Sequence, residues 1–591
     1  MTVALMAIFH PDRRGVRRIP TPAREALALP AVLVLAALVR FVAAGRHEAL
    51  GQSDAYAHLQ FLQDVLATGR LRHPLYPPFY HLLLAVPTRL FRWDPYMVVR
   101  FAGVFFGTLL VGAVYGLARR AFGKRAALWS AFLVAACPLF HHLQKTGVGA
   151  FPNQLGLLLV PLLLWAWDAA GHGRWSAALA GVTLSALLAA TVPVMLLDLL
   201  PLLALDLVLH RRGRFAPPLR LLVISGLALA AAGAAVVFLR GLGPPLIRTL
   251  GVMAGLPSPE GQPPAAALGN IFWALIRPKR WGLPGGLAGA GAAVLGLGGV
   301  IAVWRLRDAP TAARLVALWG LLAWAQTVFG VFQFALYWRA GWTLLTALAI
   351  GLGAWLEAFP RGRPPWARAG GVAQSLTLAS AVFSFLFPPA PQPHLSAAED
   401  DLVRFALELR AWHDGTRIGR SPSWINELAG ADHVAVWTRV YFGNPDLQGE
   451  PLHAFLENRT RIRLHALRPE DVPRLEWPTD CPSIVVLDDR VVPVRPSWAS
   501  RLANPALTRD FEQGRARWME AGRRLRECAE AAERAGWTVR RYQYPHGLEI
   551  LWLHPPRPMP STDIPPASRP PTHAGQTPPM VVLAGIARNR A

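Results

Sequence analysis

The sequence has few charged residues for its length. Charged residues make up 16% of the 591-residue chain, whereas hydrophobic residues make up 53%, and the mean hydropathy is +0.31. Soluble proteins of ordinary composition carry about 25% charged residues, so this composition excludes an ordinary soluble protein. We therefore expect a polytopic membrane protein with α-helical spans.

Acidic residues are the scarcer of the two charged classes. The chain has 36 acidic against 60 basic residues and a formal net charge of +24. In a soluble protein this excess would indicate a nucleic-acid partner. Here much of the arginine lies in short runs between apolar segments, as it does in cytoplasmic loops. We therefore expect a membrane-bilayer environment and no nucleic-acid partner.

Cysteine is nearly absent. Three cysteines cannot form a disulfide framework, and Cys137 lies inside an apolar stretch. Cys481 and Cys528 could pair if the C-terminal region lies outside the cytoplasm, and two free thiols are the equal alternative. The sequence leaves both possibilities open.

Long apolar runs, by contrast, are abundant. A helix needs about 20 mostly apolar residues to cross the hydrocarbon core. About eleven segments meet this requirement, near residues 27–44, 97–118, 126–143, 153–168, 175–190, 192–209, 220–239, 283–304, 315–335, 341–358 and 370–387.

The basic residues between these segments predict their orientation. When eleven spans are threaded in order, the arginine-rich stretches 119–125, 211–214, 305–307 and 361–363 fall on the same side as the basic N-terminus. Positive loops stay in the cytoplasm. We expect a cytoplasmic N-terminus and an extracytoplasmic C-terminus.

Composition divides the chain into four regions. Residues 1–26 form a basic N-terminus, 27–387 the transmembrane domain, 388–554 a soluble α/β domain and 555–591 a Pro-rich, disordered tail. Short apolar runs predict strands at 433–437, 461–465 and 483–487 and a closing hairpin at 539–553. The stretch 511–535 is predicted to be a helix that ends at Gly536.

The candidate chemistry lies just after the first apolar segment, in Gly51-Gln-Ser-Asp-Ala-Tyr-Ala-His-Leu59. If this segment is helical, Asp54 and His58 share one face, because they are four residues apart. The pair could hold a metal or move a proton. Ser53 and Asp54 also suit a helix N-cap, and composition alone does not separate these interpretations.

The form Ser53-Asp-Ala-Tyr-Ala-His58 resembles the acidic motif of the GT-C superfamily of membrane glycosyltransferases. That superfamily includes oligosaccharyltransferases, protein O-mannosyltransferases and lipid A aminoarabinose transferases. The following stretch, from His73 to His81, is similar to the aromatic and Pro-rich region after that motif. The resemblance covers residues 27–360 by topology.

The resemblance implies transfer of a sugar from a polyprenyl-phosphate-linked donor to a glycan, lipid or protein acceptor. It implies that this happens at the extracytoplasmic face, and the Arg-, Ala- and Pro-rich composition indicates that the membrane is a bacterial inner membrane. Asp54 takes the role of base or metal ligand, and His58 stands beside it. The implied substrate-binding residues are Tyr56, His73, Tyr80, Lys145, Asn153 and Arg339.

No cofactor follows from the sequence, and a divalent metal ion is one of two alternatives. Many relatives carry a second acid in the second extracytoplasmic loop, but residues 141–153 contain none. Hard divalent ions prefer oxygen ligands. Either the enzyme works without metal, with Lys145 offsetting phosphate charge, or His58, His141 or His142 completes a site for a borderline ion. We favour the metal-free alternative.

Several of these residues also have ordinary structural interpretations. Lys145 suits a lysine that reaches lipid head groups, and Arg339 suits an anchor in an aromatic belt. Asn153 suits a helix cap. Asp168 and Asp206 lie near predicted cytoplasmic helix ends, where interfacial placement explains them, whereas Asp198 lies within a span and is expected to face a partner or cavity.

Two other classes of function compete with the glycosyltransferase. A transporter or flippase of anionic substrates would show related halves and charges at the membrane midplane. The halves show no similarity, and Asp198 is the only acid well inside a span. A non-enzymatic scaffold would present the C-terminal domain, but eleven spans exceed what an anchor requires.

Overall fold

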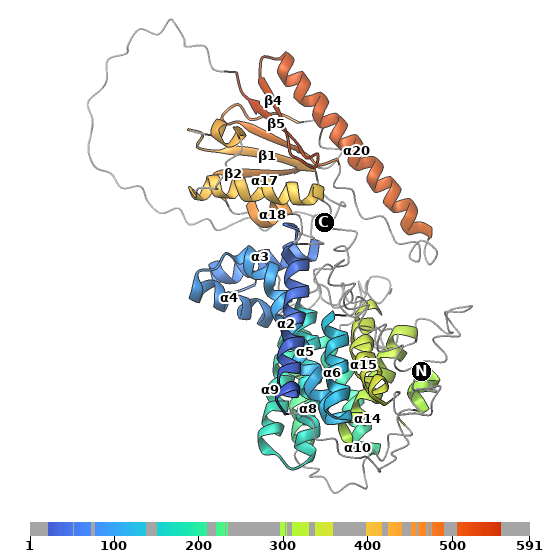
Figure 1. Ribbon diagram of the computed structural model, residues 1–591. Coiled ribbons are helices and arrows are strands. Elements are labelled where there is room, and N and C mark those ends of the chain that lie inside the picture. Colours follow the sequence, from blue (N-terminus) through green and yellow to red (C-terminus); the bar gives the residue numbers. More distant parts are fainter. Residues whose placement is uncertain are drawn as a thin grey trace, which may run out of the picture.

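The computed structural model consists of a helical part and a C-terminal sheet domain (Figure 1). Asp54, Asp198 and Arg339 lie in helices, but their side chains are outside the described set. The structure describes residues 22–45, 47–50, 53–71, 77–136, 151–209, 220–230, 232–233, 296–301, 303, 310–329, 337–358, 397–416, 423–428, 430–439, 451–456, 459–467, 472, 475–489 and 505–556.

Long apolar helices pack side by side in the helical part, around α5 (Figure 1). Asp94 caps the N-terminus of α5 by accepting from the Tyr96 amide at 2.7 Å, and Gly123, with φ of +93°, ends it. The helices are α2 (Pro22–Gly45), α5 (Pro95–Phe122), α6 (Lys124–Ala136), α8 (Phe151–Gly171), α9 (Trp175–Thr191), α10 (Pro193–Leu209), α14 (Thr311–Phe329) and α15 (Tyr337–Ala358).

These eight helices fall on eight of the apolar segments named from the sequence. Among the described residues, α5 and the Pro152–Gly171 part of α8 are long and apolar enough to cross a membrane. The segment 370–387 lies outside the described residues. The count of eleven spans stays a prediction.

Two shorter helices lie between the first two long ones. They are α3 (Ser53–Thr68) and α4 (Phe79–Phe91), which pack against each other and against α5. Figure 1 shows them beside the upper end of α2, on the side of the helical part that faces the sheet domain. The Asp54 motif is therefore helical.

The C-terminal domain is built on a five-stranded mixed sheet with order β2-β1-β3-β5-β4. Strands β2, β1 and β3 are parallel, and β5 runs antiparallel to both β3 and β4. The strands are β1 (Val434–Arg439), β2 (Ile462–Leu467), β3 (Ser483–Leu487), β4 (Thr538–Gln543) and β5 (Glu549–His554). All of them fall where the sequence predicts strands or a hairpin.

Helices cover both faces of this sheet, which makes a three-layer α/β domain (Figure 1). Alternate strand residues point to opposite faces: Val436 and Ile484 belong to one buried cluster, and Val485 belongs to the other. On the first face lie α17 (Ala397–Asp414), the 3-10 helix Ser423–Leu428 and α18 (Pro451–Leu456). The second face is covered by α20 (Pro505–Arg534), which extends further than the predicted helix.

A buried ion pair joins three helices of the helical part. The Asp206 carboxylate of α10 accepts from Arg314 of α14 at 2.7 Å and from the Trp167 indole of α8 at 2.9 Å. Arg314 and Asp206 are both fully buried. The expectation of ordinary interfacial placement was therefore wrong for Asp206, because it missed a partner more than 100 residues away in sequence.

The two cysteines of the C-terminal domain are free thiols. Cys481 is buried and Cys528 is half-buried, and both contribute to the cluster under α20. Cys137 lies outside the described residues. Of the two alternatives left open above, the described residues show the unpaired one.

Candidate functional site

The candidate site is built around the first turns of α3. Ser53 begins the helix and Asp54 is its second residue, so the four-residue spacing places the Asp54 and His58 positions on one helix face. Tyr56 lies between them in sequence and about 160° away from His58 around the helix axis. The helix therefore presents Tyr56 and His58 to different neighbours.

His58 faces α4, where it meets a second histidine. Its Nδ1 lies 3.0 Å from Nε2 of His81, and both rings are buried. At this distance one ring donates a proton and the other accepts it, so the tautomers of the two imidazoles are coupled. The Tyr80 and Phe61 rings pack edge-on against His58, with centroids 5.9 and 6.1 Å away.

Burial sets the protonation state of this group. It lowers the pKa of His81 from 6.5 to about 3, because a charged imidazolium would lose its hydration. Burial also raises the pKa of the Tyr80 hydroxyl well above its usual value. His81 is therefore neutral at physiological pH, and so is Tyr80.

Tyr56 points the other way, into the junction with the C-terminal domain. It is buried, and its hydroxyl accepts from the Leu50 amide at 3.1 Å. The same hydroxyl lies 3.5 Å from a carboxyl oxygen of Glu399 in α17. Its ring contacts Phe455 of α18 edge-on at 6.4 Å. This residue thus joins α3 to the C-terminal domain.

The remaining predicted site residues lie elsewhere or outside the described set. Asn153 is buried in the first turn of α8, and Arg339 is the third residue of α15. Lys145 and His73 lie outside the described residues, as do His141 and His142. Of the predicted site residues, the structure brings His58 and Tyr80 into contact, whereas Tyr56 faces the C-terminal domain.

A metal role for His58 stays a prediction. Within the residues that the structure describes, no three His, Cys, Asp or Glu side chains gather as a metal site would require. The Asp54 carboxylate and the two histidines at 141 and 142 are not among them. His58 Nδ1 lies 3.0 Å from His81 Nε2, so the pairing with His81 occupies one of its two possible ligand atoms.

Sequence reasoning missed two residues of this region, His81 and Glu399. In the sequence, His81 could be recognised only as the last residue of the aromatic and Pro-rich stretch. Its pairing with His58 could not be predicted, because a separation of 23 residues carries no periodic signal. Glu399 belongs to a helix that was not predicted. Burial and the neighbouring Asp400 carboxylate raise its pKa well above the usual value. Its long-range contact with α3 leaves no trace in local sequence.

Part of the chain matches a known protein family. Residues 73–238 match the family described as Dolichyl-phosphate-mannose-protein mannosyltransferase. The matched stretch begins after α3, so it does not include Asp54, and it extends past the end of α10. It confirms the resemblance to membrane glycosyltransferases of the GT-C superfamily and indicates that class of protein.

No curated protein sequence matches the chain. Solved structures give distant similarities. The oligosaccharyltransferase of Archaeoglobus fulgidus is 15% identical with a TM-score of 0.41, and the match covers 74% of this chain and 64% of that chain. ArnT from Cupriavidus metallidurans is 15% identical, with 90% and 98% covered and a TM-score of 0.43.

The mycobacterial arabinofuranosyltransferase AftD is 14% identical, with 90% of this chain and 40% of that chain covered and a TM-score of 0.45. TM-scores below 0.5 do not establish a shared fold on their own. The family match is therefore the comparison that supports a class of function.

Proposed function

We propose that this protein is a membrane glycosyltransferase that transfers a sugar from a polyprenyl-phosphate-linked donor to an acceptor at the extracytoplasmic face. The observation that carries the proposal is the family match over residues 73–238. The family's description names a sugar attached to a lipid phosphate as donor, and this chemistry is the basis for the proposed donor class. The match does not favour a transporter or flippase.

The surface of the helical part supports a place in the bilayer. Large apolar side chains on α2, α5 and α9 are exposed, including Leu27 at 69%, Phe105 at 61% and Trp175 at 70%. Soluble monomers rarely expose large contiguous apolar patches. Lipid acyl chains are themselves apolar, so they would cover such side chains without a free-energy penalty.

Within this proposal Asp54 deprotonates or orients the acceptor nucleophile. General-base catalysis needs a carboxylate within hydrogen-bond reach of the group that it deprotonates. Arg339, which can form two parallel hydrogen bonds, and Lys145 would stabilise the negative charge of the departing carrier phosphate. If a divalent ion takes part, it would supply the same stabilisation, with Asp54 as a ligand.

The test is sugar transfer by the purified protein in proteoliposomes supplied with polyprenyl-phosphate-linked sugars. We expect Asp54→Asn to lower the transfer rate by about 10²–10⁴-fold, the usual contribution of a general base. Asp64→Asn, the same chemical change ten residues further along α3, is the matched control. It should retain transfer when the protein elutes as a folded species.

Two results would contradict the proposal at different points. Full turnover in the Asp54→Asn variant would contradict the catalytic role of Asp54, but the proposed glycosyltransferase activity would still stand. No transfer by the wild-type protein from any of a panel of polyprenyl-phosphate sugars would remove the glycosyltransferase function itself.

A further inference from the structure

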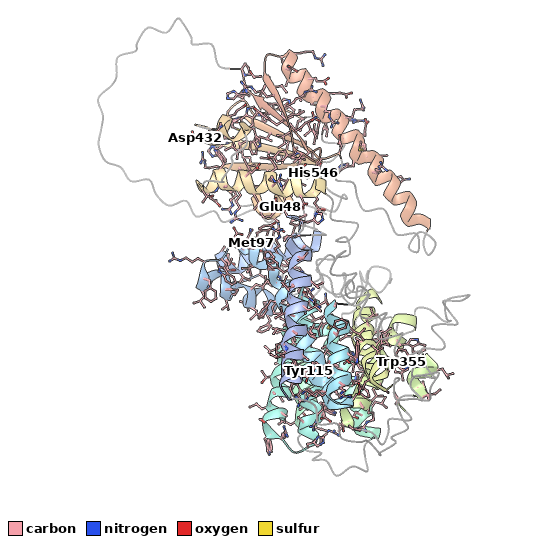
Figure 2. All side chains as sticks on the ribbon, in the orientation of Figure 1. Glu48, Met97, Tyr115, Trp355, Asp432 and His546 are labelled. Atoms are coloured by element: carbon pink, nitrogen blue, oxygen red, sulfur yellow. The ribbon has the colours of Figure 1, made fainter. Side chains whose placement is uncertain are left out.

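The chain between α2 and α3 is held by a helix of the C-terminal domain. Asp400, in the first turn of α17, accepts from the Ala49 amide at 2.8 Å and lies 2.7 Å from Nδ1 of His47. Glu48, between them, pairs with Arg404 of the same helix at 3.4 Å. Figure 2 labels Glu48 where the two parts of the molecule meet.

The same short segment is held from the other side by α5. The Tyr96 hydroxyl donates to the Glu48 carbonyl, and the Arg100 guanidinium donates to the carbonyls of Gly45 and His47 at 3.2 and 2.5 Å. Residues 47–50 are thus fixed between α5 and α17. We call this segment the clamped loop.

Aromatic packing extends the clamp to α3. The Phe455 ring of α18 contacts the Tyr56 ring at 6.4 Å and the Tyr96 ring at 5.3 Å, both edge-on. One side chain of the C-terminal domain therefore touches both α3 and α5. Arg410 of α17 adds an ion pair with Asp94, the N-cap of α5, at 2.6 Å.

The clamp acts on the place where α3 begins. Leu50, the last residue of the clamped loop, donates its amide to the hydroxyl of Tyr56. Tyr56 is two residues after Asp54, so the geometry of the first turn of α3 depends on these contacts. A displacement of about 1 Å at a reacting group can lower a rate a hundredfold.

We infer that α17 of the C-terminal domain is a positioning element for the Asp54 turn, with Asp400 as its principal positioning residue. Only the expected effect on turnover rests on the proposed function. The structural content of the inference, that Asp400 holds residues 47–50 and through them the start of α3, stands independently of what the protein catalyses.

The experiment compares Asp400→Ala and Asp400→Asn in the full-length protein. We expect Asp400→Ala to speed amide hydrogen exchange of Ala49 and Leu50 by about tenfold or more, because a charge-assisted hydrogen bond is lost. We expect it to lower kcat of sugar transfer with little change in KM for the donor. Asp400→Asn retains an acceptor for the Ala49 amide and should restore most of both properties.

Asp480→Asn is the matched control, because Asp480 pairs with Arg463 at 2.8 Å in an exposed place on the sheet domain. It should leave both measurements unchanged. If Asp400→Ala does not fold, Phe455→Leu tests the same clamp through the aromatic contact and should likewise speed exchange in residues 47–59.

The inference would be overturned if a folded Asp400→Ala or Phe455→Leu variant exchanged the amides of residues 47–59 at the wild-type rate. It would also be overturned if exchange became faster while kcat stayed unchanged. An absence of transfer by the wild-type protein would overturn the proposed function instead, and exchange would still decide whether the clamp orders the loop.

Discussion

A buried histidine pair lies between α3 and α4. His58 and His81 share one hydrogen bond inside an aromatic cage of Tyr80 and Phe61, and burial holds the pKa of His81 near 3. An unfolded chain would protonate this histidine near pH 6.5. The pair therefore links the stability of the region to pH.

The sign of this linkage follows from the lowered pKa. Below pH 6.5 the unfolded state binds a proton that the native state does not, so the contribution of His81 is complete above pH 6.5 and is lost as the pH falls toward 3. Between pH 7 and pH 5 the loss is about 2 kcal/mol.

We expect the thermal midpoint of the wild-type protein in detergent to fall over this pH range and that of His81→Gln to fall less. Glutamine keeps a polar group at this position but does not titrate. His433→Gln, at an exposed histidine, is the control and should follow the wild type. Equal pH dependence in wild type and His81→Gln would contradict this account.

At the residue scale the sequence gives only part of the candidate site. The Asp54 motif could be found because its signal is local: a polar break with a four-residue spacing after an apolar segment. His81, Glu399 and Asp400 could not be found, because their contacts join residues 23 to about 350 positions apart. Long-range pairing leaves no mark on periodicity or composition.

At the scale of elements, α6 and α15 approach so closely that a Cβ on one glycine would meet backbone atoms of the other helix. A Cβ on Gly353 of α15 would lie 2.2 Å from Oγ and 2.6 Å from N of Ser130, and 2.8 Å from the Ala126 carbonyl. Ser130 also donates to the carbonyl of Ala126 at 2.8 Å. Small residues at such crossings let helix backbones approach closely.

We expect Gly353→Ala to destabilise the protein by about 1–3 kcal/mol, because two of the clashes involve backbone atoms that must move. Gly351→Ala, two residues away in the same helix, is the matched control, since its Cβ would meet nothing within 4 Å. It should be neutral or slightly stabilising. The check is the thermal midpoint in detergent, and equal midpoints for the two variants would argue against a close crossing.

Elements with strong periodicity were predictable, and the others were not. Strands β1, β2 and β3 are short apolar runs, and the C-terminal end of α20 is marked by Gly536, whose φ is +90°. By contrast, α17 carries many charged residues and was not predicted, although Phe405 and Leu409 are fully buried and even Asp401 is buried. Helix α4 was hidden by its Pro-rich surroundings.

For the whole molecule, orientation in the membrane is the prediction with most consequences. The alternation of basic loops predicts that Arg174, in the turn between α8 and α9, lies in the cytoplasm and that the C-terminal domain lies outside. The proposed reaction at the outer face requires this arrangement, because α3 lies beside that domain (Figure 1).

Two variants, each with one cysteine introduced into a chain whose natural cysteines have been replaced, should differ in their labelling. In intact cells whose outer barrier is permeabilised, a thiol reagent that cannot cross the inner membrane should label Gln513→Cys on α20 but not Arg174→Cys. Both positions are exposed. Lysed membranes should label both, and the reverse pattern in cells would put the proposed site on the cytoplasmic side.

The ring of Phe455 between Tyr56 and Tyr96 also limits how the chain can be recombined. In a chimera with a foreign C-terminal domain, a different side chain would have to pack against Tyr56 and Tyr96, whose rings contact Phe455 edge-on in this protein. Such a transplant should succeed only when the donor's own counterparts of residues 47–56 and 94–100 travel with it.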